Sequence, residues 1–117
     1  MSRRDWRVRI DDILEAIRAI QEYTRDMTFE AFVADARTVH AVVHNLMVIG
    51  EAARSLPEEF TARHAELPWD KMRATRNVIV HVYFGIRKEI VWETVQTDLP
   101  PLVPLLNQLL EDDGDDP

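Results

Sequence analysis

The 117-residue sequence lacks cysteine. It can therefore form no disulfide, no thiolate metal site and no cysteine nucleophile, which suits a reducing compartment. It has only three glycines, which disfavours long flexible loops. No apolar run approaches the roughly 18 residues of a membrane span, and the basic N-terminus leads into an amphipathic pattern and not into a signal-peptide core. We expect a cytoplasmic protein without a membrane segment.

The charge is unevenly distributed. The formal net charge of −7 argues at first against a nucleic-acid partner, but five of the 21 acids lie in the last seven residues, which contain no base. Residues 1–110 thus carry 16 acids against 14 bases, twelve of them arginines, and arginine suits bidentate phosphate contacts. We expect one domain over 1–110 with room for a local basic cleft, and an acidic disordered tail over 111–117.

Two long segments in the first half have helical periodicity. The first predicts a helix from about 4 to 25, capped by Ser2, with apolar positions at Ile10, Ile13, Leu14, Ile17 and Ile20. Asp35 can cap a second helix, whose buried side would comprise Val39, Val42, Val43, Leu46, Ile49 and Ala53. Gly50 lies on that side and permits close approach of another helix, at a cost of about 1 kcal/mol relative to alanine.

The second half continues the helical pattern. Helices are predicted over 58–63, 70–84 and 88–97, although Val78-Ile79-Val80 alone would suit a buried strand. A last, leucine-rich helix follows Pro100 and Pro101, and Pro104 should remove one of its hydrogen bonds and bend it. The sequence predicts an all-α antiparallel bundle of four to five main helices. Because the last helix has more apolar surface than such a bundle usually hides, we also expect a homodimer.

Arginine, asparagine, histidine and tyrosine occur together only in segment 73–85. On a straight helix Arg76 and Tyr83 lie ~20° apart, and Asn77 and His81 share an adjoining strip. Arg76 and His81 are ~140° apart. They can contact the same phosphate only if the long arginine side chain reaches around the helix, if the first turn is distorted, or if a second subunit completes the cleft.

These residue types fit RNA cleavage by attack of the 2′-hydroxyl. Histidine can exchange protons near neutral pH, and arginine can stabilise the charge of the phosphorane without a metal. Asn77 can orient the histidine or the phosphate, and Tyr83 can donate to a phosphate oxygen or stack on a base. From spacing alone, the alternative is a surface arginine beside a half-buried, hydrogen-bonded histidine.

A further pattern is a series of short motifs in a fixed order. They are Ile13–Ile17, Phe29–Phe32, Asn45–Leu46, Ile49–Ala53, Leu56–Pro57, Pro68–Trp69, Arg76–Ile86, Val91–Trp92 and Asp98–Pro100. Over about residues 8–110, the sequence resembles the HepT-like toxin family of the HEPN (higher eukaryotes and prokaryotes nucleotide-binding) superfamily. The resemblance implies a HEPN-like helical homodimer that cleaves RNA without a metal or other cofactor.

The resemblance also implies partners and roles. It implies the toxin of a type VII toxin–antitoxin pair, neutralised by a nucleotidyltransferase-fold (MntA-like) antitoxin, in some members by AMPylation of the motif tyrosine, here Tyr83. Arg76 and His81 match the catalytic pair, and Asn77 matches the polar residue after the arginine. Asn45 and Glu51 stand at positions typical of the family and are carried over as supports. Asn77, Tyr83 and Arg73, all in segment 73–85, are further candidates for supporting or RNA-binding roles.

The sequence departs from the family at two positions. Thr75 replaces a bulky apolar residue, and Arg87 replaces an aspartate, which puts the cap of the next helix in doubt. The alternative function is a non-catalytic helical nucleotide-binding or regulatory subunit of a nucleotidyltransferase, in which Arg76 and Tyr83 would bind nucleotide and His81 would be structural.

Two other groups of residues each allow two interpretations. His40 and His44 are four apart, but no third ligand stands at a helpful spacing, so we expect no metal site. The N-terminal arginines either extend a phosphate-binding surface or are only solvated; they are Arg3, Arg4, Arg7 and Arg9.

Overall fold

A computed structural model describes residues 2–77 and 87–112 of the chain. These residues form helices and turns and no strand, which confirms the predicted all-α HEPN-like bundle. Within the same ranges no helix is both long and apolar enough to cross a bilayer. Segment 78–86, and with it the predicted site residues His81 and Tyr83, lies outside the described residues, as does the end of the acidic tail.

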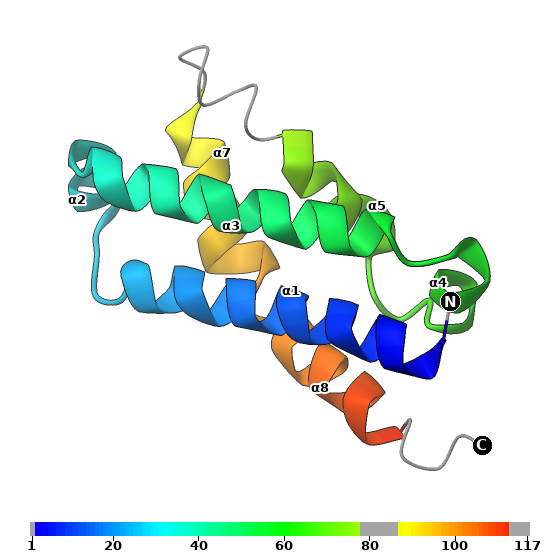
Figure 1. The fold of residues 1–117 in the computed structure, drawn as a ribbon. Helices are drawn as coiled ribbons and strands as arrows, with labels where there is room; N and C mark the ends of the chain where they lie inside the picture. The colour runs from blue at the N-terminus through cyan, green and yellow to red at the C-terminus, as the bar shows by residue number, and fades with distance from the viewer. Residues whose placement is uncertain (1, 78–86, 113–117) are drawn as a thin grey trace.

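The two longest helices form the centre of the bundle. Helices α1 (Arg3–Tyr23) and α3 (Ala36–Arg54) run antiparallel and side by side (Figure 1). Every apolar position predicted for them is buried. The predicted caps are confirmed: the Ser2 side chain accepts a hydrogen bond from the Asp5 backbone N–H, and the Asp35 side chain accepts one from the backbone N–H of Thr38.

Helix α1 ends earlier than the sequence predicted. Its last residue is Tyr23 and not residue 25. The hydroxyl of Thr24 donates to the Ile20 carbonyl at 2.8 Å, and Asp26 adopts a left-handed backbone with φ of 61°. Both features turn the chain toward the short helix α2 (Phe29–Ala34), whose N-cap is Thr28.

Two short helices follow α3. Helix α4 (Glu58–Arg63) begins after Pro57, and α5 (Trp69–Ala74) begins after Pro68, so both prolines stand just before a helix start. The indole N–H of Trp69 donates to the His64 carbonyl at 2.8 Å, which ties the start of α5 to the end of α4.

The predicted continuous helix over 70–84 is wrong in its described part. After Ala74 the backbone tightens into the 3₁₀ helix η1 (Thr75–Asn77). A 3₁₀ turn has three residues per turn, so it changes the direction in which Arg76 and Asn77 project. A distorted turn was one of the three ways for Arg76 and His81 to share a phosphate, but His81 lies outside the described residues.

The predicted helix over 88–97 is also divided. Helix α7 (Lys88–Glu93) passes into the π-helix η2 (Thr94–Asp98), in which the Leu99 N–H donates to the Thr94 carbonyl at 3.0 Å. Arg87 precedes α7 in a left-handed conformation and makes no side-chain cap. The doubt about this cap is therefore confirmed.

Helix α8 (Leu102–Asp112) closes the bundle against α1. Pro104 is its third residue, where the backbone N–H has no intrahelical partner, so the predicted loss of an internal hydrogen bond is wrong. Arg7 of α1 donates to the Leu110 carbonyl at 2.9 Å and so satisfies one carbonyl at the end of α8.

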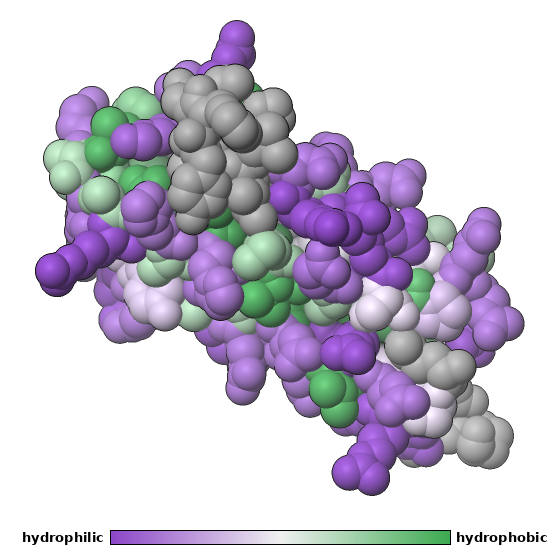
Figure 2. All heavy atoms as spheres, turned by 45° about the horizontal axis from the view of Figure 1, so that its top comes forward, coloured by the Kyte–Doolittle hydropathy of each residue, from purple (hydrophilic) through white to green (hydrophobic). Residues whose placement is uncertain are grey.

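The expected surplus of apolar surface on the last helix is small. Three of its apolar residues are buried within the chain, namely Leu102, Leu106 and Leu109. Val103, Leu105 and Leu110 are only partly buried. Figure 2 shows a face that is mostly hydrophilic, with hydrophobic side chains near the α2 end and again near its middle. Helix α8 by itself therefore gives less reason to expect a second copy than the sequence did.

Candidate functional site

Helix α3 and η1 approach each other closely at Gly50. A Cβ added to Gly50 would lie 2.7 Å from the backbone nitrogen of Arg76 and 2.8 Å from its Cβ. Only a residue without a side chain fits there. The close approach that Gly50 permitted is therefore present, and it fixes the backbone of Arg76 against α3.

Arg76 is oriented by the residue that follows this glycine. Its Nε donates to Oε1 of Glu51 at 2.8 Å, and the two side chains are 48% and 53% exposed. A half-exposed ion pair contributes only about 0–1 kcal/mol to stability. Its main effect is to select one direction for a long side chain while leaving the remaining guanidinium N–H groups to face solvent or a ligand.

Thr75 holds η1 against α3. It is buried, and its hydroxyl lies 2.7 Å from the Leu46 carbonyl and 2.8 Å from the Met72 carbonyl. A hydroxyl has one proton, so it donates to one carbonyl at a time. The departure from the bulky apolar residue of the family thus places a polar link between η1 and α3 directly before Arg76.

The other predicted residues on described segments do not join this pair. Asn45 donates its amide to the Ala41 carbonyl of its own helix. Arg73 donates to the Thr61 hydroxyl at 3.2 Å and contacts Asp70 at 3.4 Å, so it links α5 to α4. Asn77 is exposed at the end of η1. Of the predicted supports that fall within 2–77 and 87–112, Glu51 is the one that contacts Arg76.

Glu51 also lines a groove between α1 and α3, which we call the Glu51 groove. Its volume is about 400 Å³, and it is lined by Arg9, Asp12, Met47, Val48, Glu51 and Ser55. Arg9 and Asp12 form a long ion pair of 3.8 Å. Sequence reasoning singled out Arg9 but missed this groove, because nothing in the pattern of α1 says which face of α3 it meets.

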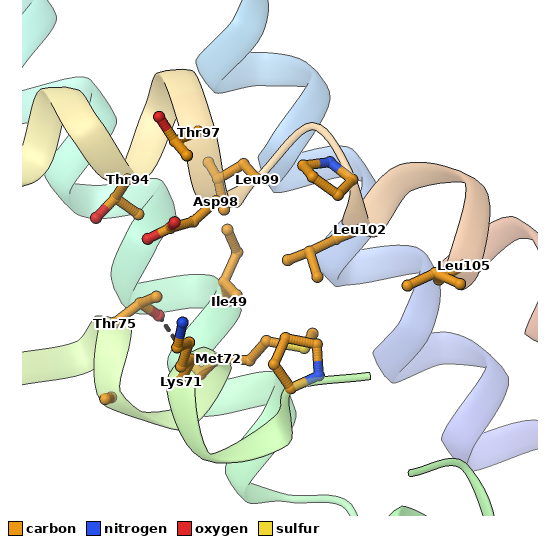
Figure 3. Close-up of a pocket in the computed structure, with 13 residues that line it drawn as sticks. Ile49, Lys71, Met72, Thr75, Thr94, Thr97, Asp98, Leu99, Leu102 and Leu105 are labelled. Atoms are coloured by element: carbon orange, nitrogen blue, oxygen red, sulfur yellow. Dashed lines mark hydrogen bonds between the residues drawn. The ribbon is translucent and has the colours of Figure 1, made fainter. Parts of the chain in front are cut away.

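A larger hollow lies on the opposite side of α3, and we call it the apolar pocket. Its volume is about 490 Å³, and Ile49 of α3, Met72 of α5 and Leu102 of α8 meet in it (Figure 3). Lys71 and Asp98 lie at its edge. Ile49 and Glu51 are two residues apart, hence ~200° apart around α3, so the two hollows open to opposite sides.

The described residues offer little for a metal. Across 2–77 and 87–112, no three histidine or acidic side chains gather closely enough to hold an ion. His40 and His44 are both exposed on α3.

Comparison with known proteins assigns the family. The model of the family described as Ribonuclease HepT-like matches residues 13–109, most of the chain. The chain belongs to this HepT-like family. In Figure 1 the matched residues run from the middle of α1 into α8.

Curated relatives of this HepT-like chain are similar over most of their length. It is 42% identical over 93 residues to a Thermococcus cleftensis protein named "Probable ribonuclease HepT", covering 80% of this chain and 84% of that protein. It is 38% identical over 117 residues to a Methanocaldococcus jannaschii protein named "Putative RNase MJ0127", covering 99% and 97%. No solved structure gives a significant match.

Proposed function

We propose that this HepT-like chain is a metal-independent RNA endonuclease in which Arg76 and His81 carry the chemistry. Membership of the family and relatives named as ribonucleases support the RNase activity. The observation that carries the residue assignment is the 2.8 Å contact of Glu51 with Arg76, which holds a guanidinium at the surface in one direction.

The proposed reaction requires three events at one phosphate. A 2′-hydroxyl loses its proton and attacks phosphorus, the phosphorane gains negative charge, and the 5′-oxygen regains a proton as it leaves. His81 serves the proton transfers, since an imidazole exchanges protons near neutral pH. Arg76 donates to the phosphorane oxygens. Cleavage leaves a 2′,3′-cyclic phosphate and a 5′-hydroxyl, and DNA, which has no 2′-hydroxyl, is not a substrate.

Asn77 and Tyr83 complete the proposed site. Asn77 is exposed directly after Arg76, where its amide can contact a phosphate oxygen. Tyr83 contacts the substrate and is the target of AMPylation by a nucleotidyltransferase-fold antitoxin. The active protein is a homodimer whose two motifs share one cleft, and it acts in the cytoplasm as the toxin of a toxin–antitoxin pair.

Cleavage in the presence of a chelator tests the catalytic assignment. Purified protein is incubated with single-stranded RNA in excess EDTA, alongside His81→Ala and the matched control His44→Ala. We expect the parent and the control to produce cyclic phosphate ends, and His81→Ala to lose about 10²–10⁴-fold in rate. Equal cleavage by all three would assign the activity to a contaminant. RNA or nucleotide binding without cleavage would favour a non-catalytic subunit.

Co-expression tests the proposed neutralisation. The chain is co-expressed with the product of the adjacent reading frame, and its mass is measured by mass spectrometry. We expect a mass increase equal to AMP that is absent in Tyr83→Phe. An unchanged mass would rule out AMPylation as the mode of neutralisation.

A further inference from the structure

The Glu51 groove begins at the side chain that orients Arg76. One oxygen of Glu51 accepts the hydrogen bond from Arg76, and the same residue lines the groove. A strand that presents one phosphate to Arg76 can therefore reach the groove with a neighbouring nucleotide. On α1, at its other wall, lies a second arginine, Arg9.

Arg9 is available to a ligand. Its side chain is 44% exposed, and its contact with Asp12, itself 41% exposed, is 3.8 Å long. An exposed i,i+3 pair at that distance contributes little, so a phosphate can take the place of Asp12 at low cost. A guanidinium can hold a phosphate with two parallel hydrogen bonds.

The groove is not a general anion site. Two carboxylates, Asp12 and Glu51, line it beside the single arginine, and they oppose a free anion. The half-buried Met47 and Val48 of α3 line the same groove. A thioether makes favourable contacts with an aromatic ring, and carboxylates accept hydrogen bonds from base amino or ribose hydroxyl groups.

We propose that the Glu51 groove binds one nucleotide of single-stranded RNA next to the cleaved linkage. Its base lies against Met47 and Val48, and its outer phosphate is held by Arg9. The volume of about 400 Å³ falls within the range of small-ligand pockets, roughly 300–1,000 Å³. An unpaired strand is required, because a base must leave its stack to enter. This inference rests on the proposed function and extends it from the reacting phosphate to the neighbouring nucleotide.

The inference predicts different effects on long and short substrates. A dinucleotide has only the reacting phosphate, whereas a ten-nucleotide RNA has outer phosphates for Arg9. We therefore expect Arg9→Ala to raise the KM for the longer RNA about tenfold, the scale of one charged hydrogen-bonded contact. We expect kcat and the cleavage of the dinucleotide to stay unchanged.

Salt dependence gives an independent readout with a matched control. Loss of one phosphate contact should reduce the slope of log affinity against log salt by about 0.7 for a single strand. Arg18→Ala is the control, because Arg18 is an exposed arginine on the same helix and lies nine residues, hence ~180°, away. It should leave both KM and slope unchanged. Met47→Ala should weaken the binding of both the dinucleotide and the longer RNA, since both carry a base.

The outcomes separate this inference from the proposed function. If the parent cleaves RNA but Arg9→Ala has the same KM and salt slope as Arg18→Ala, the groove does not hold the strand and the proposed function stands. If the parent cleaves no RNA, the proposed function fails. The groove is then tested by fluorescence anisotropy of labelled RNA, where weaker binding by Arg9→Ala than by Arg18→Ala supports it and equal binding overturns it. Thermal melts verify that each variant is folded.

Discussion

The two sides of α3 differ in what their residues can do. On one side, the Arg76–Glu51 pair and the Glu51 groove contain charged groups that are half exposed and held by weak contacts. On the other side, the apolar pocket is built on core residues such as Ile49 and Met72, with exposed fractions of 0% and 1%. Substitutions on the first side should change activity with little change in stability, and substitutions on the second should do the reverse.

The largest expected effect on stability lies in the apolar pocket. Met72→Ala should lower the free energy of unfolding by about 2–5 kcal/mol, because it removes a buried side chain and enlarges an existing hollow. Urea denaturation followed by circular dichroism measures this loss. The folded fraction should cleave RNA at nearly the parent rate. A large loss of kcat at urea concentrations below the unfolding transition would show that the two sides of α3 are coupled.

Gly50→Ala should affect both sides, because the glycine stands between them. The added methyl group would overlap the backbone of Arg76, and overpacking of this kind costs about 1–3 kcal/mol. At an unconstrained helical position the same substitution would stabilise by about 1 kcal/mol. We expect a lower melting temperature together with a reduced rate of cleavage. A higher melting temperature would contradict the close approach of α3 to η1.

Glu51 should act as a positioning residue on the polar side. Glu51→Ala should lower kcat about tenfold by releasing Arg76, with little change in the melting temperature, because the pair is half exposed. Glu51→Gln keeps an oxygen acceptor for Arg76 and should recover most of the rate. Equal losses in both variants would indicate that charge, and not orientation, is what Glu51 contributes.

The smallest expected effect is a pH dependence at the start of α3. Hydrogen bonds from the side chain and backbone of Thr38 lower the pKa of Asp35 below its usual value of 3.8. A carboxyl whose pKa is lowered in the folded state stabilises the protein at pH values above its unfolded-state pKa. This stabilisation is lost as the pH falls through the folded-state pKa. The acid unfolding of Asp35→Asn should therefore depend slightly less on pH below about 4; an unchanged profile would contradict a role for this charge.

Much of the fold could be predicted from local pattern. The apolar positions of α1 and α3 repeat with helical spacing, and the caps at Ser2 and Asp35 depend on residues three positions away. The break at Thr75 and the π-helix over 94–98 could not be predicted in this way. The hydroxyl of Thr75 reaches a carbonyl 29 residues away in sequence, and such a contact exists only once the helices are packed.

The candidate site was predictable in part. Gly50 indicated a close approach, and Glu51 followed from the resemblance, but its pairing with Arg76 required the packed structure. Arg73 shows the converse, since its place in segment 73–85 suggested an RNA contact whereas its side chain is tied to α4. Sequence gives the residue types at a site, and packing decides which of them meet.

The most direct test of the central claim compares these two arginines. Single-turnover cleavage of RNA is measured for Arg76→Ala and for Arg73→Ala, three residues earlier and of the same type. The account predicts that Arg76→Ala loses about 10²–10³-fold in rate while folded Arg73→Ala stays within about threefold of the parent. Equal losses in the two variants, or full activity of Arg76→Ala, would contradict it.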